Sequence, residues 1–164
     1  MRVVPDACSL INLHKGGVLD VVLGLEGVSL RLPEGVLKEC VELGEELQDH
    51  IGSGRIGEIP DTDLSVERVA QFANENNLGV GESECIARCQ DDPSLVFCTD
   101  DRRARHVARQ HVGDARVIGT EDLLLECVRQ GMSPLDAYTA HETMRARGAF
   151  LPERPREFFI LDPR

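Results

Sequence analysis

The segment 95–99 constrains the fold more than any other part of the chain. Its sequence, Leu-Val-Phe-Cys-Thr, is an almost unbroken apolar run, and Asp100 and Asp101 follow it directly. A continuous apolar strand is typical of the interior of a parallel sheet, where helices cover both faces. The segment therefore predicts a central parallel sheet with acidic residues at the end of one of its strands.

Strands and helices are expected to alternate along the rest of the sequence. Further short strands are predicted at residues 3–4, 28–32 and 115–118, with a short edge strand at 55–59. Apolar spacing and capping residues predict helices at residues 10–15, with Ser9 as its cap, and at 18–25, 34–48, 63–76, 82–90, 102–111, 121–129 and 134–147. This order predicts an α/β three-layer sandwich, with a mostly parallel sheet of about four to five strands and helices on both faces.

The composition is that of a single ordinary domain. The chain has 164 residues, of which 41% are hydrophobic, and this is enough to bury a core. We expect one domain over residues 1–148 and a C-terminal tail over 149–164, packed on the domain or extending from it. The sequence shows no signal-peptide pattern and no apolar run near the roughly 20 residues of a membrane span, so a cytoplasmic protein is expected.

The net charge of -11 argues against a generally basic nucleic-acid binder. An acidic protein can still hold RNA if its carboxylates bind metal and its arginines lie around them. A basic partner protein is the other use for an acidic surface. The arginines do cluster, at positions 102, 103, 105 and 109 and again at 145, 147, 154 and 156.

The six cysteines form no Cys-x-x-Cys pair, so a zinc ribbon or a thioredoxin motif is not supported. In a reducing compartment a cysteine is most often a small buried hydrophobe. A cysteine-based redox or zinc protein is therefore the least supported function for this chain.

Acidic residues follow the expected strands and begin the expected helices. Asp6 ends the first strand, and Asp100 and Asp101 end the apolar strand. Glu82 and Glu84 stand in the first turn of a helix. Because ligands of open α/β sheets bind at the carboxyl ends of the strands, these acids are placed to converge.

Glu39 strengthens this interpretation. In the expected helix 34–48 it lies between Val36 and Leu43 on the apolar stripe. Each of the other acids could instead cap a helix or interact with its dipole, but capping does not explain Glu39. Clustered carboxylates repel one another, and a divalent ion such as Mg²⁺ or Mn²⁺ relieves the repulsion.

The sequence resembles the PIN-domain family, in which a Gly-Glu-x-Glu helix start and an Asp-Asp-x-x-x-Arg segment mark one subgroup. The matching segments, in order, are residues 4–13 (VPDACSLINL), 33–39 (PEGVLKE), 79–87 (GVGESECIA), 98–105 (CTDDRRAR) and 117–120 (VIGT).

The resemblance implies a PIN-like fold and a ribonuclease that depends on Mg²⁺ or Mn²⁺, often the toxin of a toxin–antitoxin pair. It also implies an RNA substrate, an antitoxin that blocks the acidic cleft with a basic side chain, and a homodimer. The implied catalytic and metal-binding acids are Asp6, Glu39, Glu82 and Asp100, with Asp101 and Glu84 as second candidates for metal. The implied supporting polar residues are Ser9, Asn12, Thr99 and Thr120, and the implied phosphate contacts are Arg102, Arg103 and Arg105, for which a solvated helix face is an equal alternative.

The sequence departs from the family beside the first aspartate. The family usually has Ser or Thr there, whereas this chain has Ala7 and Cys8, with Ser9 one position later. The departure makes a second function credible, in which a catalytically weak or inactive PIN scaffold binds RNA or a protein partner without cutting.

Overall fold

The computed structural model describes residues 1–60 and 64–160, and in this part of the chain five parallel strands form one sheet. The strand order is β3-β2-β1-β4-β5. The strands are β1 (Arg2–Pro5), β2 (Ser29–Leu32), β3 (Ile56–Glu58), β4 (Leu95–Cys98) and β5 (Val117–Ile118). The expected α/β class and parallel sheet are confirmed.

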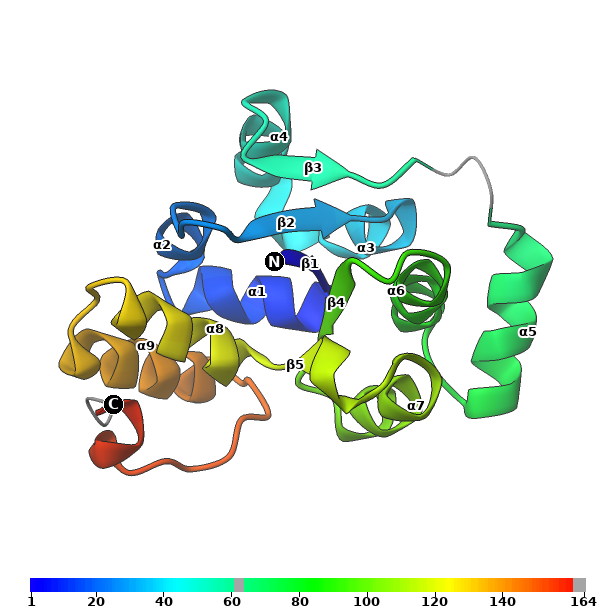
Figure 1. The fold of residues 1–164 in the computed structure, drawn as a ribbon. Helices are drawn as coiled ribbons and strands as arrows, with labels where there is room; N and C mark the ends of the chain where they lie inside the picture. Colours follow the sequence, from blue (N-terminus) through cyan, green and yellow to red (C-terminus); the bar gives the residue numbers. More distant parts are fainter. Residues whose placement is uncertain (61–63, 161–164) are drawn as a thin grey trace.

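Helices lie on both sides of the sheet (Figure 1). One group packs together as α1 (Ala7–Lys15), α2 (Leu19–Leu23), α8 (Thr120–Arg129) and α9 (Pro134–Ala146). A second group comprises α5 (Val66–Asn76), α6 (Val80–Asp91) and α7 (Arg102–Val112), and α6 also contacts α3 (Glu34–Glu39). The remaining elements are α4 (Gly44–Gly52), beside β3, and the short 3₁₀ helices η1 (Val41–Leu43), η2 (Asp114–Arg116) and η3 (Arg156–Phe159).

The core lies between the sheet and the helices. Val3 and Val4 of the central strand β1 and Phe97 of β4 are fully buried, as is Leu10 of α1. Within the described ranges no helix is both long and apolar enough to cross a membrane. The start of the expected helix 63–76 and the end of the expected tail, residues 161–164, lie outside the described residues.

Two local expectations are wrong. The first helix begins at Ala7, because Asp6 rather than Ser9 is its cap and accepts the Ser9 N–H. The expected helix 34–48 is broken after Glu39, and Gly44, with a φ of 44°, occupies a backbone region that favours glycine where the chain turns from η1 into α4. The broken helix leaves Glu39 exposed instead of on a buried stripe, and Val41 is 80% exposed.

Candidate active site

Asp6 occupies the junction of β1 and α1 at the centre of the sheet. Its backbone N–H donates to Cys98 O at 2.9 Å, which continues the pairing of β1 with β4 for one more residue. Its side chain is 2% exposed, and Oδ1 accepts the Ser9 N–H at 2.7 Å. Oδ2 is buried and has no hydrogen-bond partner within the described residues. The first aspartate therefore has one buried oxygen without a well-formed hydrogen bond in the described chain, while the side chains of Thr99 and Ser9 lie close enough to the carboxylate to lower its pKa as weak donors.

Burial raises the pKa of Asp6 to about 6. Thr99 and Ser9 lower it in part, and the negative charge of Asp100 raises it. A buried carboxyl held against its ionisation at a strand end is a common feature of functional sites. A cation beside Oδ2 would reverse the effect, because it favours the ionised form.

Asp100 ends the neighbouring strand β4 and is held by two other elements. Its Oδ1 accepts the Thr120 N–H at 2.9 Å, and its Oδ2 accepts Asn12 Nδ2–H at 3.0 Å. The Thr120 hydroxyl also donates to Oδ2. Asn12 comes from α1 and Thr120 from α8, so three elements fix the orientation of this carboxylate. Two of the four expected supporting residues thus contact Asp100.

The other two expected supporting residues lie beside the first aspartate. Thr99 is fully buried, and its Oγ1 accepts the Asp101 N–H at 3.1 Å. Ser9 is fully buried as well, and among the described residues its hydroxyl has no hydrogen-bond partner. Both hydroxyls face the surroundings of Asp6, since both lower its pKa.

Asp101 caps the N-terminus of α7, the role that the sequence offered as the alternative to metal binding for these acids. Its Oδ1 accepts the Ala104 N–H at 2.8 Å at the start of α7, and the residue is exposed. The capping hydrogen bond uses Oδ1, so Oδ2 is still available to a ligand, and Asp101 also lines the cavity described below.

Glu82 and Glu39 lie near each other at the start of α6. Glu82 Oε2 accepts the Gly79 N–H at 2.9 Å, and Glu39 Oε1 accepts the Gly81 N–H at 3.1 Å. Burial raises the pKa of Glu82; the Gly79 N–H lowers it, and the charges of Asp101 and Glu39 raise it. A Cβ at position 81 would lie 2.6 Å from Glu39 Oε1, so this approach requires the glycine or a shift of Glu39.

Glu84 has a structural position. It is buried, its Oε2 accepts the Gly35 N–H at 2.8 Å, and its Oε1 lies 3.4 Å from Arg88 Nη2. These contacts tie α6 to α3. Both carboxylate oxygens are engaged, as are those of Asp100, and Glu84 stays a predicted second candidate for metal.

Cys8 lies among the candidate acids. Burial, together with the negative charges of Asp6, Glu82 and Glu39, raises the pKa of its thiol to about 11. All six cysteines are free thiols; Cys8 is exposed and the other five are buried. Cys8 is therefore within electrostatic range of the acid that follows β1 and of acids in α3 and α6.

The donor chemistry fits a hard divalent ion, but the ligands are not preassembled. Every candidate donor is a carboxylate oxygen, and Asp6 Oδ2 is buried without a partner. Across residues 1–60 and 64–160, however, no three His, Cys, Asp or Glu side chains approach closely enough to hold a metal. Both oxygens of Asp100 are occupied by Asn12 and Thr120. Binding of an ion would therefore require side-chain movement, for which the exposed Glu39 has the most freedom.

A cavity of about 710 Å³ opens beside Asp100 and Asp101, whereas Asp6, Glu39 and Glu82 are not part of its lining. Asp100, Asp101, Asn12 and Cys8 form part of its lining, and the chain at residues 148–152 forms another part. Two cations also line it, Lys15 and Arg102. The C-terminal segment thus borders the candidate site.

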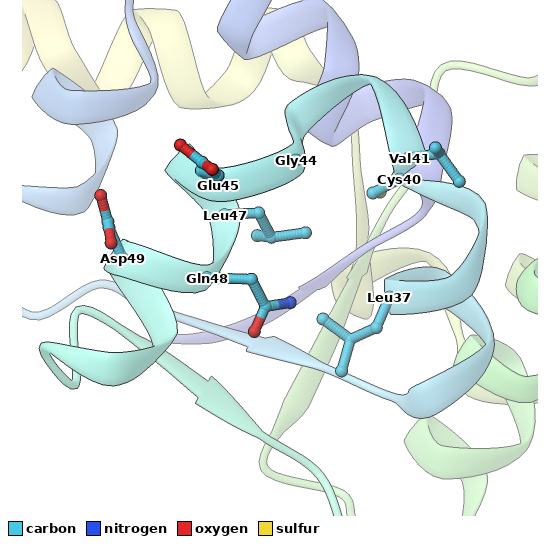
Figure 2. A pocket seen from close by; sticks show the side chains of 8 residues that line it. All are labelled: Leu37, Cys40, Val41, Gly44, Glu45, Leu47, Gln48 and Asp49. Carbon is cyan, nitrogen blue, oxygen red and sulfur yellow. The ribbon is translucent and has the colours of Figure 1, made fainter.

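A second pocket, of about 520 Å³, lies between α3 and α4 (Figure 2). Leu37 and Gln48 point into it, while Glu45 and Asp49 lie along its outer side (Figure 2). None of the candidate metal ligands lines this pocket, so we assign the candidate site to the cavity beside Asp100.

The three candidate arginines differ in their contacts. Arg105 Nη2 donates to Thr99 O at 2.8 Å and lies 4.0 Å from Asp100 Oδ1. Arg103 Nη1 donates to Asn77 O at 3.2 Å. Arg102 is exposed and lines the cavity, so it is the best placed of the three to contact a phosphate.

The sequence interpretation missed a partly buried polar cluster that fixes the C-terminal segment. Glu121 accepts two hydrogen bonds from Arg154, each of 2.9 Å, and His141 Nε2 lies 3.0 Å from Glu121 Oε1. His141 is fully buried, and Arg154 lies over the Phe158 ring at 4.5 Å. Residue 121 was predicted only as the start of the helix 121–129, and this local pattern does not indicate a pairing with Arg154 or His141.

The parallel sheet, with acids at the carboxyl ends of its central strands, defines an open α/β protein whose candidate site lies at that edge. A family model described as a PIN domain matches residues 2–160, and the chain belongs to the PIN-domain family. PIN domains are generally nucleases and typically use divalent metal ions.

The crystal structure of PAE2754 from Pyrobaculum aerophilum is similar to this chain, with a TM-score of 0.54 and 18% sequence identity. The similarity covers 79% of this chain and 97% of that chain, and it concerns the fold. No curated protein sequence matches this chain at a significant level.

Proposed function

We propose that the chain is a metal-dependent endoribonuclease of the PIN type. The observation that carries the proposal is Asp6 Oδ2, a buried carboxylate oxygen with no partner in the described chain, beside the strand-end Asp100. A buried unpaired carboxylate is unfavourable unless a cation or a proton occupies it. The membership of the chain in a nuclease family favours the cation.

The residues would divide the work as follows. Asp6 and Asp100 would anchor the ion, and Glu39 and Glu82 would swing toward it to complete the cluster. Asn12 and Thr120 hold Asp100 in place. When bound, Mg²⁺ or Mn²⁺ would stabilise charge on the phosphodiester and lower the pKa of a water molecule.

Phosphate groups of the RNA would meet the cations of the cavity. Arg102 is exposed, and Lys15 pairs with Glu42 only at 3.4 Å on the surface, where ion pairs are weak. Both can therefore turn to a phosphate without leaving a buried charge unpaired. They supply the local positive charge that the overall composition lacks.

Cleavage of a single-stranded RNA tests the proposal. The wild type should cut it with Mg²⁺ or Mn²⁺ and lose activity on addition of a chelator. Asp6→Asn and Asp100→Asn should each lose about 100-fold or more in rate, since each removes a charge that holds the ion. Equal activity of Asp6→Asn and the wild type would refute the proposal.

The second candidate function is a PIN scaffold that binds RNA or a protein partner without cutting. Cys8 stands where the family usually has a hydroxyl, and no three-ligand group is preassembled in the described chain. Calorimetric titration with Mn²⁺ separates the two functions, because a binding scaffold has no metal site that Asp6→Asn abolishes. The toxin role, the antitoxin and the homodimer stay predictions, which the neighbouring reading frame and the solution mass would test.

A further inference from the structure

Phe150 is the most exposed large apolar side chain of the described residues, with 99% of its surface open. It lines the same cavity of about 710 Å³ as Asp100 and Asn12. A single exposed apolar residue is ordinary, but this one is an aromatic ring at the edge of the candidate active site.

The backbone on both sides of Phe150 is fixed. The Ala149 N–H donates to Met144 O at 3.0 Å, and Leu151 is only 9% exposed. Farther along, Arg154 is bound twice by Glu121. The ring is therefore presented to solvent from an anchored segment, and little freedom of the main chain is lost when a ligand covers it.

The lining of the cavity combines three kinds of group. Phe150 offers an aromatic face, Lys15 and Arg102 offer positive charge, and Asp100 and Asp101 offer carboxylates. Aromatic platforms next to cations are the common way in which proteins hold single-stranded nucleic acid, because every unpaired base has a face that can stack. Carboxylates in the same cavity would repel the backbone except where a metal ion neutralises them.

We propose that Phe150 stacks on an unpaired base of the RNA substrate and so sets which phosphodiester lies at Asp6 and Asp100. The inference rests on the proposed function for its ligand, an RNA strand. The ring can donate no conventional hydrogen bond, so it selects an unpaired and preferably large base and not one base identity. Phe150 is in this sense a substrate-positioning residue, and the RNA must be single-stranded at that point.

Binding is tested without cleavage in the wild-type background, with Ca²⁺ in place of Mg²⁺ so that the carboxylates are neutralised while the RNA stays intact. A short single-stranded RNA carrying one 2-aminopurine is titrated with the protein, and stacking is expected to quench its fluorescence. Phe150→Ala should remove the quenching and weaken binding about tenfold or more, whereas Phe150→Trp should keep both. Phe150→Leu keeps an apolar side chain but no aromatic face, and it should behave as Phe150→Ala.

A matched control is Leu135→Ala, which truncates another exposed apolar side chain, on α9, that does not line the cavity. This variant should bind and quench as its parent does. In the active protein, Phe150→Ala should raise KM about tenfold with little change in kcat, since stacking contributes equally to bound substrate and transition state. Circular dichroism checks that each variant is folded.

Equal quenching by the parent and Phe150→Ala would overturn the inference, and so would full activity of Phe150→Leu. Loss of binding to a protein partner with RNA binding unchanged would overturn it as well, because the ring would then serve a protein interface. If the wild type binds and quenches the RNA but does not cut it, the nuclease proposal fails and the stacking inference stands. If the wild type cuts the RNA but quenches 2-aminopurine at no position, the stacking inference fails and the nuclease proposal stands.

Discussion

The side-chain amide of Asn12, in the first helix, donates to Oδ2 of Asp100, at the end of β4, across 3.0 Å. The two residues are 88 positions apart in the sequence, and the bond joins α1 to the carboxyl edge of the sheet. Through it, a neutral residue fixes the direction of one of the two central carboxylates.

Asn12→Ala should therefore weaken metal-dependent activity without unfolding the protein. Loss of a group that orients a metal ligand typically lowers affinity or rate about 10- to 100-fold. The lost hydrogen bond should lower the free energy of unfolding by only about 1–2 kcal/mol. Mn²⁺ titration and RNA cleavage measure the first effect, and urea unfolding measures the second.

Asn76→Ala is the matched control for this variant, because among the described residues Asn76 Nδ2 donates within its own helix, to Phe72 O. It should leave the metal affinity unchanged. A change of similar size in both variants would mean that Asn12 acts through general stability.

Asp6→Asn should stabilise the metal-free protein at neutral pH. Burial raises the pKa of Asp6 from 3.8 to about 6, so folding favours its protonated form. This contribution is fully present below pH 3.8, declines as the pH rises toward 6, and is absent above, where the buried charge destabilises the fold. Asparagine carries no charge, so the free energy of unfolding at pH 7 in chelator should rise by about 1–3 kcal/mol.

The control for the aspartate is Asp101→Asn. Asparagine caps a helix as well as aspartate does, so this exposed position should change stability by less than about 0.5 kcal/mol. Added Mg²⁺ should raise the melting temperature of the wild type and not that of Asp6→Asn. A less stable Asp6→Asn in chelator would contradict the assigned burial of an unpaired charge.

Cys8 should report metal binding through its reactivity. Cys8 is accessible to solvent. Its partial burial and the negative charges of Asp6, Glu82 and Glu39 together raise the pKa of its thiol to about 11. Since the thiolate is the nucleophile, iodoacetamide should alkylate Cys8 slowly at pH 8. Mg²⁺ neutralises the surrounding acids and should accelerate the reaction. Mass spectrometry of the labelled peptide gives the rate, Cys8→Ser should abolish it, and a rate in Glu82→Gln equal to that of the wild type would contradict the assigned electrostatics.

Glu121→Gln should loosen the C-terminal segment and reduce the acid sensitivity of the fold. Burial opposes ionisation of Glu121, but the hydrogen bonds from His141 and Arg154 and the charge of Arg154 lower its pKa from 4.5 to about 2. Its contribution to stability is therefore present above pH 4.5 and is lost as the pH falls toward 2. Glu121→Gln should lower the free energy of unfolding at pH 7 by about 1–3 kcal/mol.

Two measurements test this variant. Hydrogen exchange should increase at residues 149–160, and unfolding between pH 4.5 and 2 should vary less with pH than in the wild type. Glu126→Gln serves as the control, since in the described part of the chain Glu126 contacts Arg129 of its own helix and Gln130, the residue that follows the helix. It should change stability by less than about 1 kcal/mol.

The sequence allowed the sheet and two of its acids to be predicted for local reasons. The apolar run at 95–99 is too short for a typical helix and is rich in strand-forming residues, which favours a buried strand, and Asp100 ends it because aspartate favours a turn or a helix cap. The argument for Glu39 failed, because the apolar stripe continued across Gly44 whereas the helix did not. The spacing of apolar residues alone does not predict where a glycine such as Gly44 adopts a positive φ.

The C-terminal cluster shows what local patterns miss. Glu121 and Arg154 are 33 residues apart, and neither belongs to a repeating pattern. Their pairing depends on how α8 and the final segment pack, which one sequence does not reveal. The same holds for Phe150, whose place beside Asp100 follows from the turn at Gly148 and not from any motif.

The central position of β1 has a consequence for synthesis of the chain. Residues 2–5 leave the ribosome well before their neighbour β4, which follows about 90 residues later, and the Thr120 contact to Asp100 comes later still. Until then Asp6 remains hydrated and the acids remain apart. A nascent or truncated chain that stops before residue 120 can therefore have no complete site.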